Sequence, residues 1–206
     1  MSEDVPVTVV DAGTGNLRSV VAALRKIGAA VTLTYDPEVV RRAPRVVLPG
    51  VGAFGEFMRG LRERHLDEAL RAVIAAGRPL LGICVGMQAL LEVSEEMGEH
   101  FGLGVVRGRV VRFDLPPGYK VPHTGWNQLW PQWEAPLLAG LRPGDYAYFN
   151  HSYICRVDEP AAVLALTDYG VDFVSALAWE NCWGVQFHPE KSQAVGERLL
   201  RNFLDL

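Results

Sequence analysis

Two short segments bring together residue types that can perform nucleophilic catalysis. Cys84 stands in GICVGMQ, with a glycine two residues away on either side, directly after the apolar run 79–83, which we interpret as a buried strand. Such glycines allow a sharp strand-to-helix turn with the mechanics of a G-x-S-x-G nucleophile elbow. In QFHPEKS, Pro189 favours extended backbone at His188. Glu190 then faces the same way as His188 and can orient it, which makes a candidate Cys–His–acid triad.

Each segment also has a simpler interpretation. Taken alone, Cys84 could be an inert buried cysteine beside packing glycines, and His188 could cap a strand with Glu190 at the surface. The position of Cys84 favours catalysis, because it follows a strand and opens a helix, where α/β sheets place ligands and where a thiolate is stabilised. His151, in NHSY, is a second candidate base. It ranks lower because no carboxylate stands at a matched offset.

A hydrolase that attacks an amide also needs hydrogen-bond donors for the oxyanion. The segment PGVGAFG, residues 49–55, follows a strand that we expect beside the Cys84 strand. Its glycines let the backbone approach a substrate closely. Alone, this segment could be a plain strand-to-helix turn. Together with Cys84 we interpret it as an oxyanion loop, with the peptide N–H groups of Val51 and of Val85, the residue after the nucleophile, as donors.

The composition is that of an ordinary globular protein, with 49% hydrophobic and 21% charged residues among 206. We expect one domain over residues 1–206. The net charge of −4 argues against a nucleic-acid-binding surface. No segment has the pattern of a signal peptide or of a membrane span. Cys84, Cys155 and Cys182 lack zinc-binding spacing, so we expect a cytoplasmic protein without a metal, in which Cys155 and Cys182 are core residues.

The first part of the chain alternates between strand and helix patterns. Apolar runs predict strands over residues 5–10, 30–34, 45–48 and 79–83. Amphipathic spacing predicts helices over residues 17–27, 53–62 and 67–76, and a helix that begins with residues 87–92. This alternation predicts an α/β fold with a doubly wound, mostly parallel central sheet and helices on both faces.

The second half consists of short β-like runs separated by turn residues. They cover residues 105–113, 123–130, 146–149, 162–166, 174–179 and 183–186. We expect a mostly antiparallel elaboration on the edge of the sheet, closed by a helix over residues 193–203. Near the N-terminus, Gly13 and Gly15 do not complete a dinucleotide-binding fingerprint, because position 18 is Arg18. We therefore expect no nucleotide cofactor.

Together, these segments resemble class I glutamine amidotransferases, which have a Cys–His–Glu triad. Within that class the chain is similar to the family of glutaminase subunits of imidazole glycerol phosphate synthase. The likeness extends from the first strand to the last helix, through VVDAGTGNLRSV, LPGVGAFG, LGICVGMQALLEVSEE, KVPHTGWNQL, YFNHSY and GVQFHPEKSQ. GNLRSV and PHTGWN discriminate best, because other amidotransferases share the triad without them.

The resemblance implies an activity and a partner. The protein would hydrolyse glutamine to glutamate and ammonia, and the ammonia would pass to a separate (β/α)₈ cyclase subunit in a heterodimer. There it would react with a phosphoribulosyl formimino ribonucleotide, giving imidazole glycerol phosphate and an aminoimidazole carboxamide ribotide in histidine biosynthesis. The resemblance implies no cofactor.

The resemblance also implies roles for individual residues. Cys84 would form the glutamyl thioester, His188 would take its proton and return it to the leaving ammonia, and Glu190 would fix the imidazole tautomer. Contacts with glutamine are implied for Gly52, Gln88, Glu96, Ser152 and Tyr153. The implied cyclase-facing residues are Asn16, His123 and Trp126. Three positions depart from the residues usual in the family, namely Thr124, Asn150 and Ile154.

The glycines around Val51 raise a hypothesis about control. Gly50 and Gly52 make the flanking peptide bonds mobile. The Gly50–Val51 peptide could rest with its N–H turned away from the oxyanion, until cyclase docking and ribonucleotide binding turn it inward. One oxyanion donor is worth about 10²–10³ in rate, which is enough for a useful switch.

Other functions fit parts of the same pattern. A glutaminase subunit of another synthase, such as that of pyridoxal phosphate synthase, would share the triad but have a different partner. A cysteine protease or a deglycase-like hydrolase would need no partner, and Glu96 and the PHTGWN segment argue against it. A non-catalytic binding protein is disfavoured because Cys84, His188 and Glu190 are all present.

Overall fold

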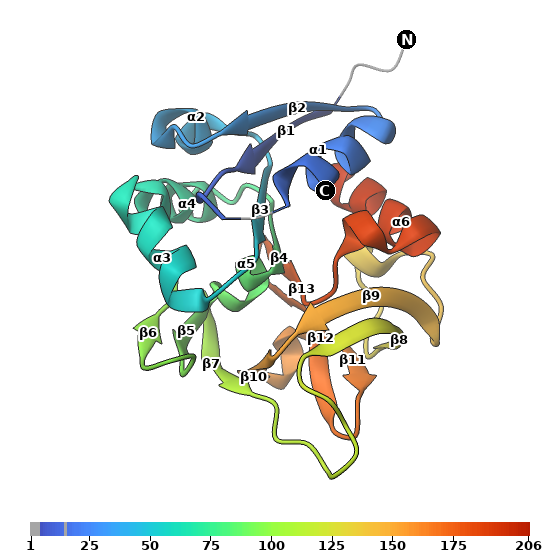
Figure 1. Cartoon of the computed structure of the whole chain (residues 1–206). Coiled ribbons are helices and arrows are strands. Elements are labelled where there is room, and N and C mark those ends of the chain that lie inside the picture. The colour runs from blue at the N-terminus through green and yellow to red at the C-terminus, as the bar shows by residue number, and fades with distance from the viewer. Residues whose placement is uncertain (1–4, 15) are drawn as a thin grey trace.

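The computed structural model describes residues 5–14 and 16–206 (Figure 1). Residues 1–4 and Gly15 lie outside the described residues. In the described part, nine strands form a central sheet in the order β2-β1-β3-β4-β13-β12-β11-β8-β9. Its parallel part comprises β2 (Ala29–Thr34), β1 (Val5–Val10), β3 (Val46–Gly50), β4 (Leu80–Cys84) and β13 (Cys182–Val185). Its antiparallel part comprises β12 (Asp172–Trp179), β11 (Val163–Asp168), β8 (His123–Pro131) and β9 (Asp145–His151).

Helices cover both faces of the parallel part. Figure 1 shows α2, α3 and α4 together on one side and α1 with α6 on the other. The longer helices are α1 (Leu17–Lys26), α3 (Phe54–Glu63), α4 (Leu66–Ala75) and α6 (Gln193–Leu204), and the shorter ones are α2 (Pro37–Arg42) and α5 (Val85–Gln88). The predicted doubly wound α/β class is therefore confirmed. In the described part of the chain, the helices are all too short or too polar to cross a membrane.

A second, smaller sheet corrects the predicted position of one strand. It has the order β10-β7-β5-β6, with β10 (Tyr153–Val157), β7 (Val106–Arg112), β5 (Leu91–Ser94) and β6 (His100–Phe101). The predicted strand 105–113 thus pairs with β10 and β5 instead of extending the central sheet. Four other predicted strands of the second half, β8, β9, β11 and β12, extend the central sheet in antiparallel order, as expected, whereas the predicted strand 183–186 is β13 and pairs parallel with β4.

The helix predicted to begin with residues 87–92 is wrong. The chain leaves Cys84 in the short helix α5, turns at Ala89 and Leu90, and continues as β5. The apolar run Ala89–Leu90–Leu91 fits a helix or a strand equally well on its pattern. Pairing of β5 with β7, from Leu91 opposite Val106, decides for the strand.

Glycines around Cys84 allow the backbones of β3, β4 and α5 to lie in direct contact. A Cβ atom on Gly86 would lie 1.8 Å from the carbonyl oxygen of Leu48, and one on Gly82 would lie 2.4 Å from the carbonyl oxygen of Gly86. No larger residue fits at either position, because both obstacles are backbone atoms. Helix α5 is thereby held tightly against β3 and β4.

We expect Gly86→Ala to lower the free energy of unfolding by about 3 kcal/mol or more, because the added methyl group meets rigid backbone. The control is Gly104→Ala, where φ is +63° and no atom lies within 4 Å of the added Cβ. There we expect only the backbone strain of about 1–2 kcal/mol. Urea unfolding of both variants measures the difference, and equal losses would contradict this account of the packing.

Candidate active site

Strand β4 and helix α5 place Cys84 at the carboxyl edge of the central sheet. All of β4 is buried, and Cys84 itself is 4% exposed. Its backbone has φ of 55° and ψ of −111°, a conformation that costs a residue with a side chain about 1–3 kcal/mol. Helix α5 begins at Val85. The sharp strand-to-helix turn predicted from the flanking glycines is therefore present.

His188 and Glu190 meet through a tight turn. His188 is extended, with φ of −100° and ψ of 97°, but Glu190 lies in the 3₁₀ turn Pro189–Lys191. His188 Nδ1 is 2.9 Å from Glu190 Oε1, and both side chains are buried. The predicted contact is present, although the extended backbone expected for Glu190 was wrong. The turn brings the carboxylate back beside the ring.

Opposing effects act on the pKa of His188. Burial lowers this pKa, but hydrogen bonds to Cys84 and Glu190 and the charges of both groups raise it to about 10. In this arrangement the ring is cationic at neutral pH, and a cationic ring beside a thiol favours the thiolate. Because Nδ1 faces Glu190, Nε2 is the ring nitrogen left for the sulfur.

Strand β9 holds the backbone of His188. The His188 N–H donates to the Tyr148 carbonyl oxygen at 2.8 Å. Ser192 provides a second link between β9 and His188. The Tyr148 N–H donates to Ser192 Oγ at 2.9 Å, and the Ser192 hydroxyl donates to the His188 carbonyl oxygen at 2.7 Å. Ser192 is buried. One hydroxyl therefore fixes His188 relative to β9, a role that the sequence analysis missed.

A pocket of about 290 Å³ opens at Cys84. The predicted residues that line it are Asn16, Val51, Gly52, Cys84, Val85, Gln88, Glu96, Ser152, Tyr153 and His188, joined by Pro122, Asn150, His151 and Lys191. Gly50 pairs with Cys84 in the β3–β4 register, which brings the predicted oxyanion loop to the pocket. Glu190 supports His188 from outside the lining.

Polar side chains form hydrogen bonds along the pocket wall, and two of them lead to the sulfur. Glu96 Oε2 accepts from the Phe54 N–H at 2.7 Å, next to the predicted oxyanion loop. Gln88 Nε2 donates to the Tyr153 carbonyl oxygen at 3.2 Å and to Gln186 Oε1 at 3.1 Å. Gln186 Nε2 in turn lies 3.7 Å from Cys84 Sγ. The sequence analysis missed Gln186, because it treated this residue as the end of an apolar strand.

Strands β8 and β9 present an exposed aromatic face. Trp126 lies opposite Tyr148, and their rings meet edge to face with centroids 6.0 Å apart. Trp126 is 46% and Trp130 is 44% exposed. Exposed aromatic rings of this kind are typical of protein interfaces. On the same strand pair, Thr124 and Asn150, both unusual for the resembled family, hydrogen-bond to each other at 3.0 Å.

The side chain of His123, in a segment expected to face the cyclase, points into the interior. It is buried, and its Nδ1 lies 3.0 Å from His151 Nε2. His151 Nδ1 lies 2.9 Å from the Tyr153 carbonyl oxygen. Aromatic rings surround the pair, namely Phe113, Phe149, Tyr169 and Phe173. Burial lowers the pKa of His123 to about 4 and that of His151 to about 3. Both nitrogens of His151 are engaged, so the geometry favours His188 as the base.

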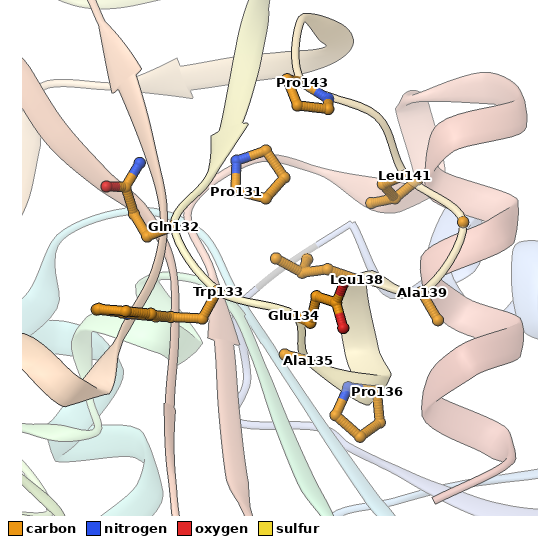
Figure 2. A pocket seen from close by; sticks show the side chains of 11 residues that line it. Pro131, Gln132, Trp133, Glu134, Ala135, Pro136, Leu138, Ala139, Leu141 and Pro143 are labelled. Atoms are coloured by element: carbon orange, nitrogen blue, oxygen red, sulfur yellow. The ribbon is translucent and has the colours of Figure 1, made fainter.

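A larger hollow of about 710 Å³ lies along the loop after β8 (Figure 2). Proline, alanine and leucine residues dominate its lining, and Glu134 is the one charged residue there. It shares no lining residue with the pocket at Cys84. Among residues 5–14 and 16–206, no group of three or more His, Cys, Asp and Glu residues is arranged to hold a metal ion. Chemistry, rather than size, therefore singles out the pocket at Cys84.

Comparison with known proteins gives consistent matches. Residues 8–206 match the family of class-I glutamine amidotransferases. The HisH subunit of imidazole glycerol phosphate synthase from Aquifex aeolicus is 50% identical over 196 residues, covering 95% of this chain and 94% of the relative. The HisH subunit from Natronomonas pharaonis is 50% identical over 206 residues, covering 97% and 94%. Among solved structures, PurLQS from Thermotoga maritima aligns with a TM-score of 0.77 at 16% identity over 98% of each chain, which bears on the fold alone.

The buried histidine pair predicts a loss of stability in mild acid. Both imidazoles have an ordinary pKa of 6.5, against about 4 and about 3 in the folded protein. Between these values the unfolded chain binds more protons. The contribution of this pair to the free energy of unfolding is therefore at its full value above about pH 6.5 and falls as the pH decreases toward 4.

Urea unfolding between pH 7 and pH 4 checks this expectation. Other acidic groups titrate in the same range, so the wild type is compared with His123→Phe, which removes one of the two imidazoles. We expect the stability of the variant to fall less steeply with decreasing pH. Equal slopes for the two proteins would count against the histidine pair.

Proposed function

Since the chain belongs to the class-I glutamine amidotransferases, and within them to the HisH subunits of imidazole glycerol phosphate synthase, we propose that Cys84, His188 and Glu190 hydrolyse glutamine and that the released ammonia serves a synthase partner subunit in histidine biosynthesis. The observation that carries the proposal is the strained turn at Cys84, in one pocket with a His188 ring held by Glu190. It unites a nucleophile, a base and an orienting carboxylate.

The reaction proceeds in two steps. The Cys84 thiolate attacks the carboxamide carbon of glutamine, and a tetrahedral oxyanion forms. When the oxyanion collapses, the C–N bond breaks, the nitrogen takes a proton from His188 and leaves as ammonia, and a thioester remains. Water then attacks the thioester with His188 as the base. The C–S bond breaks, which releases glutamate and restores the thiolate.

The oxyanion needs hydrogen-bond donors beside the strand-to-helix turn at Cys84. The Val85 N–H is one candidate, because it follows the nucleophile directly and Val85 lines the pocket. The Val51 N–H is the second, and Gly52 beside it has φ of +89°. This left-handed backbone favours glycine. Rotation of the Gly50–Val51 peptide on docking of the partner would bring the second donor into use.

The ends of glutamine meet different parts of the pocket. Both N–H bonds of Gln88 are directed at protein acceptors, so its Oε1 is left to accept from the α-ammonium group. Glu96 provides a negative charge for the same group. The backbone of Gly52, Ser152 and Tyr153, all pocket-lining residues, is placed to meet the remainder of the substrate.

The partner would dock on the exposed face of β8 and β9. Trp126 belongs to this face, and Asn150 and Lys191 join it to the pocket. Lys191 also lies over the Tyr148 ring, 5.4 Å from its centroid. Asn16 reaches the same pocket from the start of α1. We propose a (β/α)₈ cyclase subunit as this partner, so that ammonia leaves Cys84 toward the cyclase in a heterodimer.

Glutamate release tests the proposed function. The purified chain is assayed alone and with the cyclase subunit of the same organism plus its ribonucleotide ligand. We expect low activity alone, a rise of about 10²–10³-fold in the complex if one oxyanion donor is switched, and a loss of at least about 10⁴-fold in Cys84→Ala. High activity that ignores the cyclase would assign the chain to another synthase, and inactivity throughout would refute the glutaminase.

Ser192→Ala tests the support of His188. Loss of the hydroxyl removes the link between the Tyr148 N–H and the His188 carbonyl. We expect kcat to fall about 10-fold, as for the loss of one buried hydrogen bond, with KM for glutamine unchanged. Ser192→Thr keeps a hydroxyl and should recover most of the activity.

The matched control for Ser192 is Ser175→Ala. Ser175 is also buried, but its Oγ has no hydrogen-bond partner among the described residues. This change should therefore leave kcat near the wild-type value. If Ser175→Ala and Ser192→Ala lowered kcat equally, the effect would come from general packing and not from the support of His188.

A further inference from the structure

The carbonyl group of Tyr153 imposes a direction on the hydrogen bonds around it. It accepts from Gln88 Nε2 at 3.2 Å and from His151 Nδ1 at 2.9 Å. A carbonyl oxygen can only accept. The amide nitrogen of Gln88 must therefore face Tyr153, which removes the usual ambiguity between the two ends of a glutamine amide.

The fixed orientation of the Gln88 amide also fixes the orientation of the Gln186 amide. The second N–H of Gln88 points at Gln186 Oε1, 3.1 Å away. Turning the Gln186 amide round would set two NH₂ groups against each other. The oxygen of Gln186 is thereby fixed toward Gln88, and its nitrogen is fixed toward the opposite side.

The group on that opposite side is the nucleophile. Gln186 Nε2 lies 3.7 Å from Cys84 Sγ. The pairing of the neighbouring strands explains this closeness. Val185 in β13 pairs with Ile83 in β4, and Gln186 and Cys84 are the residues that follow them. The Gln186 N–H also donates to the Ser175 carbonyl oxygen at 2.9 Å, which holds the backbone in place.

Almost none of this contact is exposed to solvent. Gln186 is fully buried and Cys84 is 4% exposed. A buried amide donor without an acceptor costs about 1–3 kcal/mol. A neutral thiol is a weak acceptor, whereas a thiolate carries a full charge, and hydrogen bonds to charged groups are about twice as strong. The buried donor is thus matched to the ionised form of Cys84.

We propose that Gln186 is a further catalytic residue, whose amide donates a hydrogen bond to the Cys84 thiolate and is locked in the donating orientation by Tyr153 through Gln88. This inference rests on the proposed function. The amide stabilises the thiolate before attack on glutamine and again when the C–S bond of the thioester breaks. Between these two stages His188 gives its proton to the leaving nitrogen, so the two side chains stabilise charge on different atoms.

The experiment measures the rate of Cys84 alkylation by iodoacetamide from pH 4 to pH 9 in the full-length chain. Only the thiolate reacts. Cys155 and Cys182 are buried, and burial raises the pKa of Cys155 and raises that of Cys182 to about 12. Cys84→Ala gives the blank rate. His188 and Cys155, the titratable groups that act on the sulfur, are the same in every protein compared.

Gln186→Met is the main variant, because methionine has a similar length and no N–H. We expect the midpoint of alkylation to rise by about one to two pH units, the equivalent of one hydrogen bond to a charged group. Gln186→Glu offers acceptors and a negative charge in place of the donor, so its midpoint should rise at least as far. Wild-type midpoints in both variants would overturn the proposal.

Gln132→Met is the matched control, since Gln132 is exposed and its side chain, among the described residues, donates to the Trp130 carbonyl oxygen alone. Its alkylation midpoint should equal that of the wild type. Circular dichroism verifies that each variant is folded. Reaction of all three cysteines would reveal an unfolded chain, whose midpoint is not compared.

A measurement on the wild type does not depend on the folding of any Gln186 variant. In nitrogen-15 spectra, the side-chain NH₂ signal of Gln186 should shift with pH at the midpoint of Cys84 alkylation. The shift should vanish in Cys84→Ala. A Gln186 signal that ignores the ionisation of Cys84 would overturn the proposal. The glutamate-release assay remains separate, because a wild-type chain without glutaminase activity would refute the proposed function whatever the alkylation shows.

Discussion

The site depends on the close parallel pairing of β3, β4 and β13. In this register Gly50 lies beside Cys84, and Val185 lies beside Ile83. The next residues along each strand are those to which we assign the chemistry, so one edge of the sheet holds the predicted oxyanion loop, the proposed nucleophile and the segment from Gln186 to Glu190. Helix α5 can stay close enough to support the turn only because Gly86 leaves room for the backbone of β3. Packing and catalysis therefore constrain the same few residues.

The sequence predicts the site better than it predicts the route of the chain around it. Cys84, His188 and Glu190 were found from residue type and spacing, because a strand-to-helix turn and an X-Pro step restrict the backbone locally. The path of the chain after Gln88 could not be predicted from residue type and spacing, since the apolar run Ala89–Leu90–Leu91 fits the period of a helix and that of a strand equally well. Only its pairing partner, β7, decides the outcome. Helix α2 had a local signal that was overlooked. Asp36 stands just before Pro37, the first residue of the helix, and its side chain caps the helix by accepting from the Glu38 N–H.

The residues missed at the site share a physical reason. Ser192 and Gln186 act through hydrogen bonds with segments far away in sequence, Tyr148 for the first and Gln88 for the second. Neither spacing nor composition encodes such partners. The burial of the His123 side chain was unpredictable for the same reason. Its strand alternates between an exposed and a buried face, and only the pairing of β8 with β9 shows that His123 belongs to the buried one, with His151.

The neutral state of the histidine pair matters for the direction of this polar network. His151 gives its one N–H, on Nδ1, to the Tyr153 carbonyl oxygen, so its Nε2 must accept from His123 Nδ1. Asn127 Nδ2 then lies 3.3 Å from the remaining nitrogen of His123, and it also donates to the Asp168 carbonyl oxygen at 2.8 Å. A second proton on either ring would place two donors face to face. Neutrality, enforced by the aromatic surroundings, thus keeps the histidine pair donating toward the Tyr153 carbonyl oxygen. The same oxygen independently fixes Gln88, and through Gln88 it fixes Gln186 beside the sulfur of Cys84.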